Sequence, residues 1–79
     1  MNTHSPECVL FGAHMRELRN QKGFSQESFA NKCGIHRTYV GGVERGERNP
    51  TLITILKISS ALDIHPSELF KAMGAKTNE

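Results

Sequence analysis

The 79-residue sequence has no tryptophan, one tyrosine and only two cysteines. Two cysteines cannot build a disulfide framework, so we expect reduced thiols. No apolar run approaches the length that a membrane-spanning helix needs, and the first residues lack the pattern of a signal peptide. These absences argue against a membrane protein and a disulfide-rich secreted domain, and they predict a cytoplasmic protein.

The sequence also lacks the residue patterns that enzymes need. It has no glycine-rich phosphate loop, its carboxylates are scattered, and a chain this short offers little core for a large substrate pocket. Residues 33–36, CGIH, resemble half of a zinc site, with His4 and Cys8 as a second pair. No paired C-x-x-C or H-x-x-x-H motif accompanies them. We therefore predict no enzymatic activity, metal or cofactor, and we place Cys33 in the core.

Positive charge is concentrated in the middle of the chain. The net charge is only +2, but seven of the 10 Lys and Arg residues lie between Arg16 and Arg48, together with four of the eight Asp and Glu residues. This local surplus is typical of a surface that meets nucleic acid. The alternative interpretation is a mixed, solvated surface.

Residues 25–46, SQESFANKCGIHRTYVGGVERG, predict two short helices joined by a tight turn. Ser25 can cap the first helix through its hydroxyl. Gly34 can adopt the left-handed conformation that ends a helix. A second helix can then begin near His36 and run to about Glu44.

The second of these helices divides by angle into two sides. At about 100° per residue, the two valines fall on one side of this helix and both glycines fall on the opposite side. A glycine inside a helix costs about 1 kcal/mol relative to alanine, so two glycines on the polar side need a reason. We expect them to fill no core position and to leave backbone uncovered, so that this side fits the major groove of DNA. One side holds Val40, Val43 and Glu44, and the opposite side holds Arg37, Thr38, Gly41 and Gly42.

This segment resembles the helix-turn-helix of the XRE-type family, which includes phage repressor and Cro proteins. Residues 37–52, RTYVGGVERGERNPTL, also resemble the controller proteins of restriction–modification systems. The resemblance extends from about Phe11 to Phe70 and implies that Arg19 forms an ion pair with Glu44. It rests on Ser25, Gln26, Ala30, Gly34, Val40, Val43, Glu44 and Gly46.

The flanking segments predict three more helices and no strand. Ser5 and Pro6 begin a helix that ends at Gly23. Its apolar stripe is Cys8, Phe11, Met15 and Leu18. The whole is an all-α, compact five-helix bundle of the phage-repressor DNA-binding type, forming one domain over residues 1–79 with its helix-turn-helix at about 25–45. We expect residues 1–4 and 75–79 to be loose ends.

Thr51 caps a helix that runs from Leu52 to about Leu62. We expect Ile53 to be exposed and Ile58 to lie at the border of the inward face. Ser67 or His65 then caps a short last helix, which Gly74 ends. The expected inward face of the longer helix is Leu52, Ile55, Leu56, Ser59 and Leu62.

Arg37 and Thr38 are the first candidates for base contacts. Arginine can donate two hydrogen bonds to guanine, and threonine can bond a base or touch a thymine methyl group. The resemblance implies the same roles; the alternative for Arg37 is a pair with a phosphate or with nearby Glu residues. It also suggests base or backbone contacts at Arg48 and Asn49, and we take Arg48 as a further base contact; the alternative is that both are solvated loop residues. The N-terminus of a helix also attracts phosphate. The expected contacts to the DNA backbone are Ser25, Gln26, Tyr39, Arg45, Asn49 and Thr51.

One such motif covers few base pairs, so we expect a homodimer whose two copies lie about 34 Å apart on a pseudo-palindrome. The predicted dimerisation element is residues 64–74, with Ile53 as an additional candidate. Leu69 and Phe70 would be shared between core and interface; the alternative is that they only complete the core of one chain. The interface residues are Ile64, Leu69, Phe70 and Met73.

The predicted function is a sequence-specific transcriptional regulator that binds double-stranded DNA. Its sharper form is the autoregulatory controller of a restriction–modification operon, which activates or represses according to its position relative to RNA polymerase. The alternative is an antitoxin-type protein-interaction module with secondary DNA binding.

Overall fold

The computed structural model describes residues 5–74, and it contains only helices within that range. The all-α prediction is therefore confirmed. The predictions for residues 1–4, including His4, and for residues 75–79 lie outside the described residues. The elements are α1 Pro6–Gln21, α2 Gln26–Cys33, α3 Arg37–Glu44, α4 Leu52–Leu62, the 3₁₀ helix η1 Pro66–Phe70 and α5 Lys71–Gly74.

Three of the four longer helices begin at the caps that the sequence predicts, and the fourth, α3, begins near His36 as expected. The hydroxyls of Ser5, Ser25 and Thr51 accept hydrogen bonds from backbone N–H groups in the first turns of α1, α2 and α4. His36 caps α3 through its side chain, and His65, rather than Ser67, caps η1. These bonds satisfy donors that a helix start leaves without an intrahelical partner.

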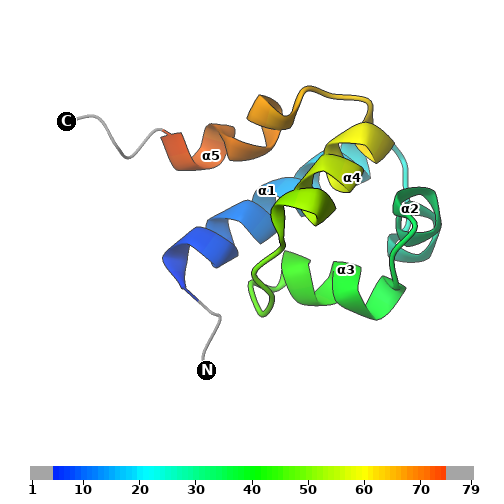
Figure 1. Cartoon of the computed structure of the whole chain (residues 1–79), viewed down its shortest axis with the longest axis horizontal. Coiled ribbons are helices and arrows are strands. Elements are labelled where there is room, and N and C mark those ends of the chain that lie inside the picture. The colour runs from blue at the N-terminus through cyan, green and yellow to red at the C-terminus, as the bar shows by residue number, and fades with distance from the viewer. Residues whose placement is uncertain (1–4, 75–79) are drawn as a thin grey trace.

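The helices enclose one apolar core. In Figure 1, α3 runs along one edge of the molecule. Both α1 and α2 pack against α3, while α4 packs against α2 and η1, and α5 returns to α1. Each packed element supplies part of the core, so contacts between helices, rather than the intrinsic stability of any one helix, hold the fold together. The largest fully buried side chains are Phe29, Met15, Ile58, Leu62, Leu69, Val40 and Val43.

The inward face predicted for α4 is partly wrong. Leu52 is 70% exposed and Leu56 is 44% exposed, whereas Ile58, placed at the border, is completely buried. The prediction that Ile53 is exposed is confirmed. Seven of the 11 residues of α4 are apolar, so angle alone cannot identify its buried side. The packing of α2 and η1 against α4 decides it.

Gly12 allows α1 to approach α3 closely. A Cβ atom on Gly12 would stand 2.1 Å from the carbonyl oxygen of Val43, far inside van der Waals contact. Any side chain at this position would push α1 away from the end of α3. The contact brings Arg19, further along α1, level with Glu44.

Candidate nucleic-acid interface

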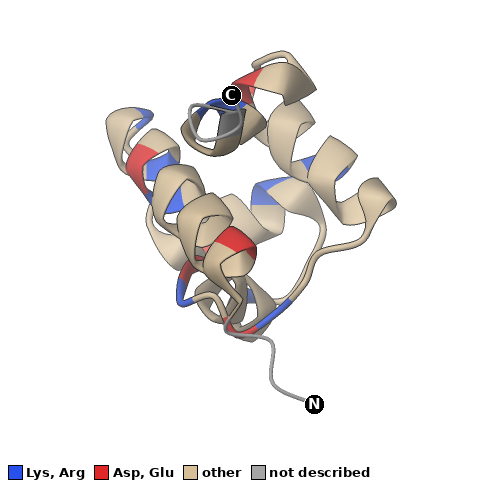
Figure 2. Cartoon of the chain, turned by 90° about the vertical axis from the view of Figure 1, so that its left-hand side faces the viewer, with Lys and Arg blue, Asp and Glu red and all other residues tan. Residues whose placement is uncertain are grey.

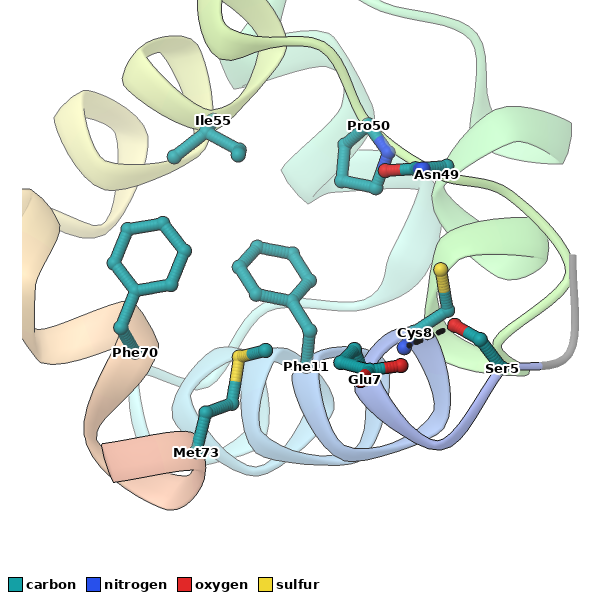
Figure 3. A pocket seen from close by; sticks show the side chains of 9 residues that line it. All are labelled: Ser5, Glu7, Cys8, Phe11, Asn49, Pro50, Ile55, Phe70 and Met73. Carbon is teal, nitrogen blue, oxygen red and sulfur yellow. Dashed lines mark hydrogen bonds between the residues drawn. The ribbon is translucent and has the colours of Figure 1, made fainter. Parts of the chain in front are cut away.

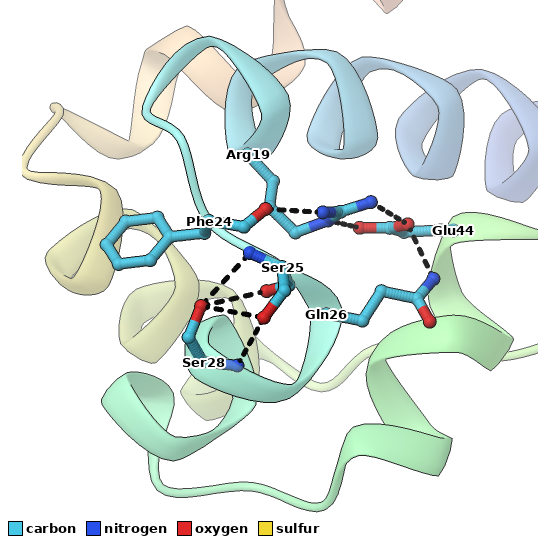
Figure 4. Close-up of polar contacts among 6 residues, drawn as sticks. All are labelled: Arg19, Phe24, Ser25, Gln26, Ser28 and Glu44. Carbon is cyan, nitrogen blue, oxygen red and sulfur yellow. Dashed lines mark hydrogen bonds and ion pairs between the residues drawn. The ribbon is translucent and has the colours of Figure 1, made fainter.

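A buried ion pair joins the end of α3 to α1. Arg19 Nε donates to Glu44 Oε2 at 2.6 Å, and Arg19 Nη2 donates to Glu44 Oε1 at 3.2 Å. Arg19 Nη1 also donates to the carbonyl oxygen of Phe24 at 2.6 Å. These contacts, drawn in Figure 4, satisfy two buried charges with directed hydrogen bonds. The predicted pair between Arg19 and Glu44 is confirmed.

The same carboxylate positions Gln26 at the start of α2. Gln26 Nε2 donates to Glu44 Oε1 at 3.0 Å, so the amide is tied to α3 (Figure 4). Ser25 is occupied by its cap: its hydroxyl accepts from the N–H of Ser28, whose own hydroxyl accepts from the N–H of Ser25. The start of α2 is therefore fixed relative to α3 before any ligand is present.

Arg37 and Thr38 project from the first turn of α3, and both are exposed. The N–H of Thr38 donates to Nδ1 of His36, which orders the start of the helix. Among residues 5–74, neither the guanidinium of Arg37 nor the hydroxyl of Thr38 makes a hydrogen bond or ion pair. Their donors are thus free for a ligand.

We expected the two glycines to leave the backbone uncovered on the polar side of α3, and this prediction is wrong. Gly41 and Gly42 are both buried. A Cβ atom on Gly41 would stand 3.0 Å from Arg45 Nη1, and one on Gly42 would stand 2.8 Å from Arg48 Cγ. Long side chains from the helix end and the following loop fold back over the two glycines. Gly41 and Gly42 therefore fill no core position, but Arg45 and Arg48 cover them.

The remaining predicted backbone contacts are dispersed around α3. Tyr39 is half-buried, and the guanidinium carbon of Arg48 lies 6.0 Å from the centre of its ring. Arg45 Nε donates to Glu47 at 2.9 Å, and this bond raises the pKa of the guanidinium. Asn49 is exposed in the loop, and the hydroxyl of Thr51 caps α4.

Figure 2 shows Lys and Arg interspersed with Asp and Glu over several helices rather than in one continuous stripe. Within residues 5–74, no group of three or more His, Cys, Asp and Glu side chains is arranged to hold a metal ion. Cys33 is buried, as predicted, and burial raises the pKa of its thiol to about 11. None of the described helices is long and apolar enough to span a membrane.

The structure separates the predicted dimer residues. Leu69 is completely buried within one chain, which favours the alternative that it completes the core, while its share in an interface stays a prediction. Phe70 is 39% exposed, and Ile64 and Met73 are half-buried. Leu69 points inward because η1 packs on α4, and the next residue then points outward.

Sequence reasoning missed two features of this region. The bond from Gln26 to Glu44 joins residues 18 positions apart, and no local pattern indicates it. The second is the path of Arg48 across Gly42. The cost of glycine inside a helix was a signal for it, because a tolerated cost suggests that something else needs the space.

Comparison with known proteins supports the prediction of a DNA-binding helix-turn-helix. The helix-turn-helix family model matches residues 15–69. The control protein C.BamHI of Bacillus amyloliquefaciens is 47% identical over 62 residues, which cover 77% of this chain and 76% of the relative. The control protein C.SmaI of Serratia marcescens is 39% identical over 70 residues, which cover 89% of this chain and 83% of the relative.

A solved structure is similar as well. The crystal structure of the restriction-modification controller protein C.AhdI from Aeromonas hydrophila superposes with a TM-score of 0.82 at 56% identity. The match covers 84% of this chain and 100% of that one. Fold, sequence and the arrangement of α2 and α3 therefore agree, and the chain belongs to the XRE-type helix-turn-helix family of DNA-binding transcriptional regulators.

Proposed function

We propose that this regulator reads a pseudo-palindromic operator as a homodimer and controls the transcription of a restriction–modification operon that includes its own gene. The observation that carries the proposal is the exposed, unpaired pair Arg37 and Thr38 at the start of α3. The opposite side of that helix is fixed in the core by Val40, Val43 and the buried Glu44. A rigid helix thus presents base-reading donors at its accessible end.

Arg37 reads guanine through two parallel hydrogen bonds, and Thr38 reads the neighbouring base or a thymine methyl group. Arg48 adds a third base contact from the loop. The bidentate geometry of arginine on guanine is worth about 1–3 kcal/mol of discrimination. These residues select the sequence, whereas the contacts to phosphate set the register.

The phosphate contacts begin at the start of α2 and of α4. Gln26 Nε2 carries two protons, and Glu44 accepts only one of them, so the second can be donated to a phosphate oxygen. Ser25 and Thr51 sit at helix N-termini, where the backbone N–H groups and the helix dipole favour an anion. Tyr39, Arg45 and Asn49 complete the predicted backbone contacts.

The dimer forms through the C-terminal part of the fold. Figure 3 shows Phe11, Ile55, Phe70 and Met73 around a hollow between α1, α4 and α5. Leu52, also on α4, is the most exposed large apolar side chain in the described chain. We define the dimer surface as Leu52, Ile55, Phe70 and Met73, and the half-buried Ile64 remains a predicted interface residue. A two-fold axis would bring this surface against itself in a second copy, as isologous interfaces do.

The names of several relatives support the proposal that the protein regulates its own operon. The similar chains include control proteins and a restriction-modification controller protein. In such a regulator, the concentration of the dimer and its position relative to RNA polymerase set the outcome. A reporter fused to the region upstream of the gene should respond to the wild-type protein and not to Arg37→Ala.

The direct test is selection from random duplex DNA at two salt concentrations. We expect a pseudo-palindrome whose half-sites lie about one helical turn apart. Arg37→Ala should lose the preference at one base position of each half-site, while Glu17→Ala, on the exposed side of α1, should select the wild-type motif. Weak binding with no motif that disappears at moderate salt would contradict the proposal, because only counterion release would then remain.

A further inference from the structure

Arg48 lies along α3 in the space that Gly42 leaves empty. A Cβ atom on Gly42 would stand 2.8 Å from Cγ, 3.4 Å from Nε and 3.7 Å from Cδ of Arg48. Carbon atoms without a bond between them approach to about 3.5–4.0 Å at best. The obstructed atom is in the middle of the arginine side chain rather than at its flexible end. An alanine here would displace Arg48 over most of its length.

Tyr39 forms the other side of this position. The guanidinium carbon of Arg48 is 6.0 Å from the centre of the Tyr39 ring, within the range of cation–π attraction. Tyr39 and Gly42 are three residues apart on α3, so they lie on the same face of the helix. We call this pair the arginine seat. It fixes the guanidinium beside the same face that presents Thr38, one turn earlier.

The loop backbone is anchored at the same residue. The N–H of Glu47 donates to the carbonyl oxygen of Gly42 at 2.8 Å. Gly46 makes the turn possible, because its φ of +78° lies in the left-handed region. Arg48 therefore starts from a defined point and follows a defined path across α3.

We propose that Gly42 is a specificity-determining residue. It admits a loop arginine to the DNA-facing side of α3, where Arg48 takes the place of the side chain that the helix itself lacks. Tyr39 is the positioning residue for its guanidinium. This inference rests on the proposed DNA-reading function and deepens it.

Gly41 provides a matched control. A Cβ atom there would be crowded by Arg45 Nη1 alone, at 3.0 Å, since the amide atoms of Gln26 lie at ordinary contact distances of 3.7 and 3.8 Å, and Nη1 is the far end of an exposed side chain. Arg45 can move aside, so Gly41→Ala should keep the wild-type site. The two glycines are neighbours in one helix, and alanine favours the helix at both. Any difference between the two variants therefore reports the arginine seat.

The experiment compares the motifs selected from random duplexes by wild type, Gly42→Ala, Gly41→Ala, Arg48→Ala and the double variant Gly42→Ala with Arg48→Ala. We expect Gly42→Ala and Arg48→Ala to lose preference at the same base position, by about tenfold or more. The double variant should match Arg48→Ala, because the two changes remove one contact. The thermal midpoint of Gly42→Ala should equal or exceed that of wild type.

A second measurement does not involve DNA. In the NMR spectrum of the wild-type protein, the side-chain protons of Arg48 should be shifted by the ring of Tyr39, and Gly42→Ala should abolish that shift. Unchanged Arg48 shifts in Gly42→Ala, or a selected motif equal to that of wild type, would overturn the inference. Failure of the wild type to select any motif would instead overturn the proposed function. The NMR shifts would then still test whether Tyr39 and Gly42 position Arg48.

Discussion

The apolar side chains of α2 and the valines of α3 are all buried, whereas α4 and η1 leave Leu52, Leu56 and Phe70 at the surface. The end of α3 is also tied to α1 and α2 through Glu44, which accepts from both Arg19 and Gln26. The DNA-reading unit is thus completed within one chain. The other region also supplies core residues but exposes apolar area as well, and our proposal is that a second copy covers that area.

The largest effect should come from disrupting the first region, in which Glu44 ties the end of α3 to α1 and α2. Glu44→Ala leaves Arg19 buried without its partner, and the loss of one member of a buried ion pair costs about 3–5 kcal/mol. Urea denaturation should show a drop of that size in the free energy of unfolding. Glu17→Ala, an exposed residue of α1, serves as the control and should change it little. Equal effects of the two changes would show that Glu44 does not hold the unit together.

The next effect tests the second region, where apolar side chains are exposed on α4 and η1. Leu52→Asp places a carboxylate on the dimer surface, at the first position of α4, where negative charge favours the helix. The fold should persist while the dimer dissociation constant rises by a hot-spot increment of about 2 kcal/mol, roughly 30-fold. Sedimentation equilibrium measures it.

Ile53→Asp is the matched change beside it. Ile53, named from the sequence as an additional dimer candidate, is 61% exposed but lines a different hollow with Lys32 and Lys57, so the proposed dimer surface leaves it out. Ile53→Asp should leave dimerisation intact. A dimer weakened equally by both changes, or by neither, would contradict the dimer surface proposed here.

A somewhat smaller effect should follow from Arg37→Ala. Removing the unpaired guanidinium should cost about 1–3 kcal/mol of specific binding, with preference relaxed at one base position per half-site. Stability should not change, because the side chain is exposed. Fluorescence anisotropy on specific and mismatched duplexes measures both quantities. Uniform weakening on every sequence would assign Arg37 to phosphate instead.

The smallest effect concerns pH. Burial raises the pKa of the Cys33 thiol from its ordinary 9.0 to about 11. The folded state therefore keeps a proton that the unfolded state releases, so this contribution to stability is constant below pH 9 and is lost as the pH rises towards 11. The unfolding free energy of wild type should fall more steeply over that interval than that of Cys33→Ala. Parallel pH profiles would contradict the raised pKa.

Local features of this fold could be predicted from the sequence. Caps depend on a few neighbouring residues, so Ser5, Ser25 and Thr51 were assigned correctly. The ion pair between Arg19 and Glu44 came from the family resemblance, since its partners lie 25 positions apart in the sequence. The base and phosphate contacts and the dimer stay predictions.

Other features depended on packing between distant segments. The buried side of α4 was misassigned because apolar residues surround most of that helix. The burial of Leu69 needs the docking of η1, and the cover on Gly41 and Gly42 needs the paths of two arginines. Periodicity within one element cannot report what another element brings to it.

The most direct test of the central claim is the mass of the protein–DNA complex, measured by native mass spectrometry on a selected duplex and on the same duplex with one half-site scrambled. We predict two chains on the intact site at limiting protein, and a large loss of affinity on the scrambled one. One chain on either duplex, with affinity that ignores the second half-site, would contradict a regulator that reads DNA as a symmetric dimer.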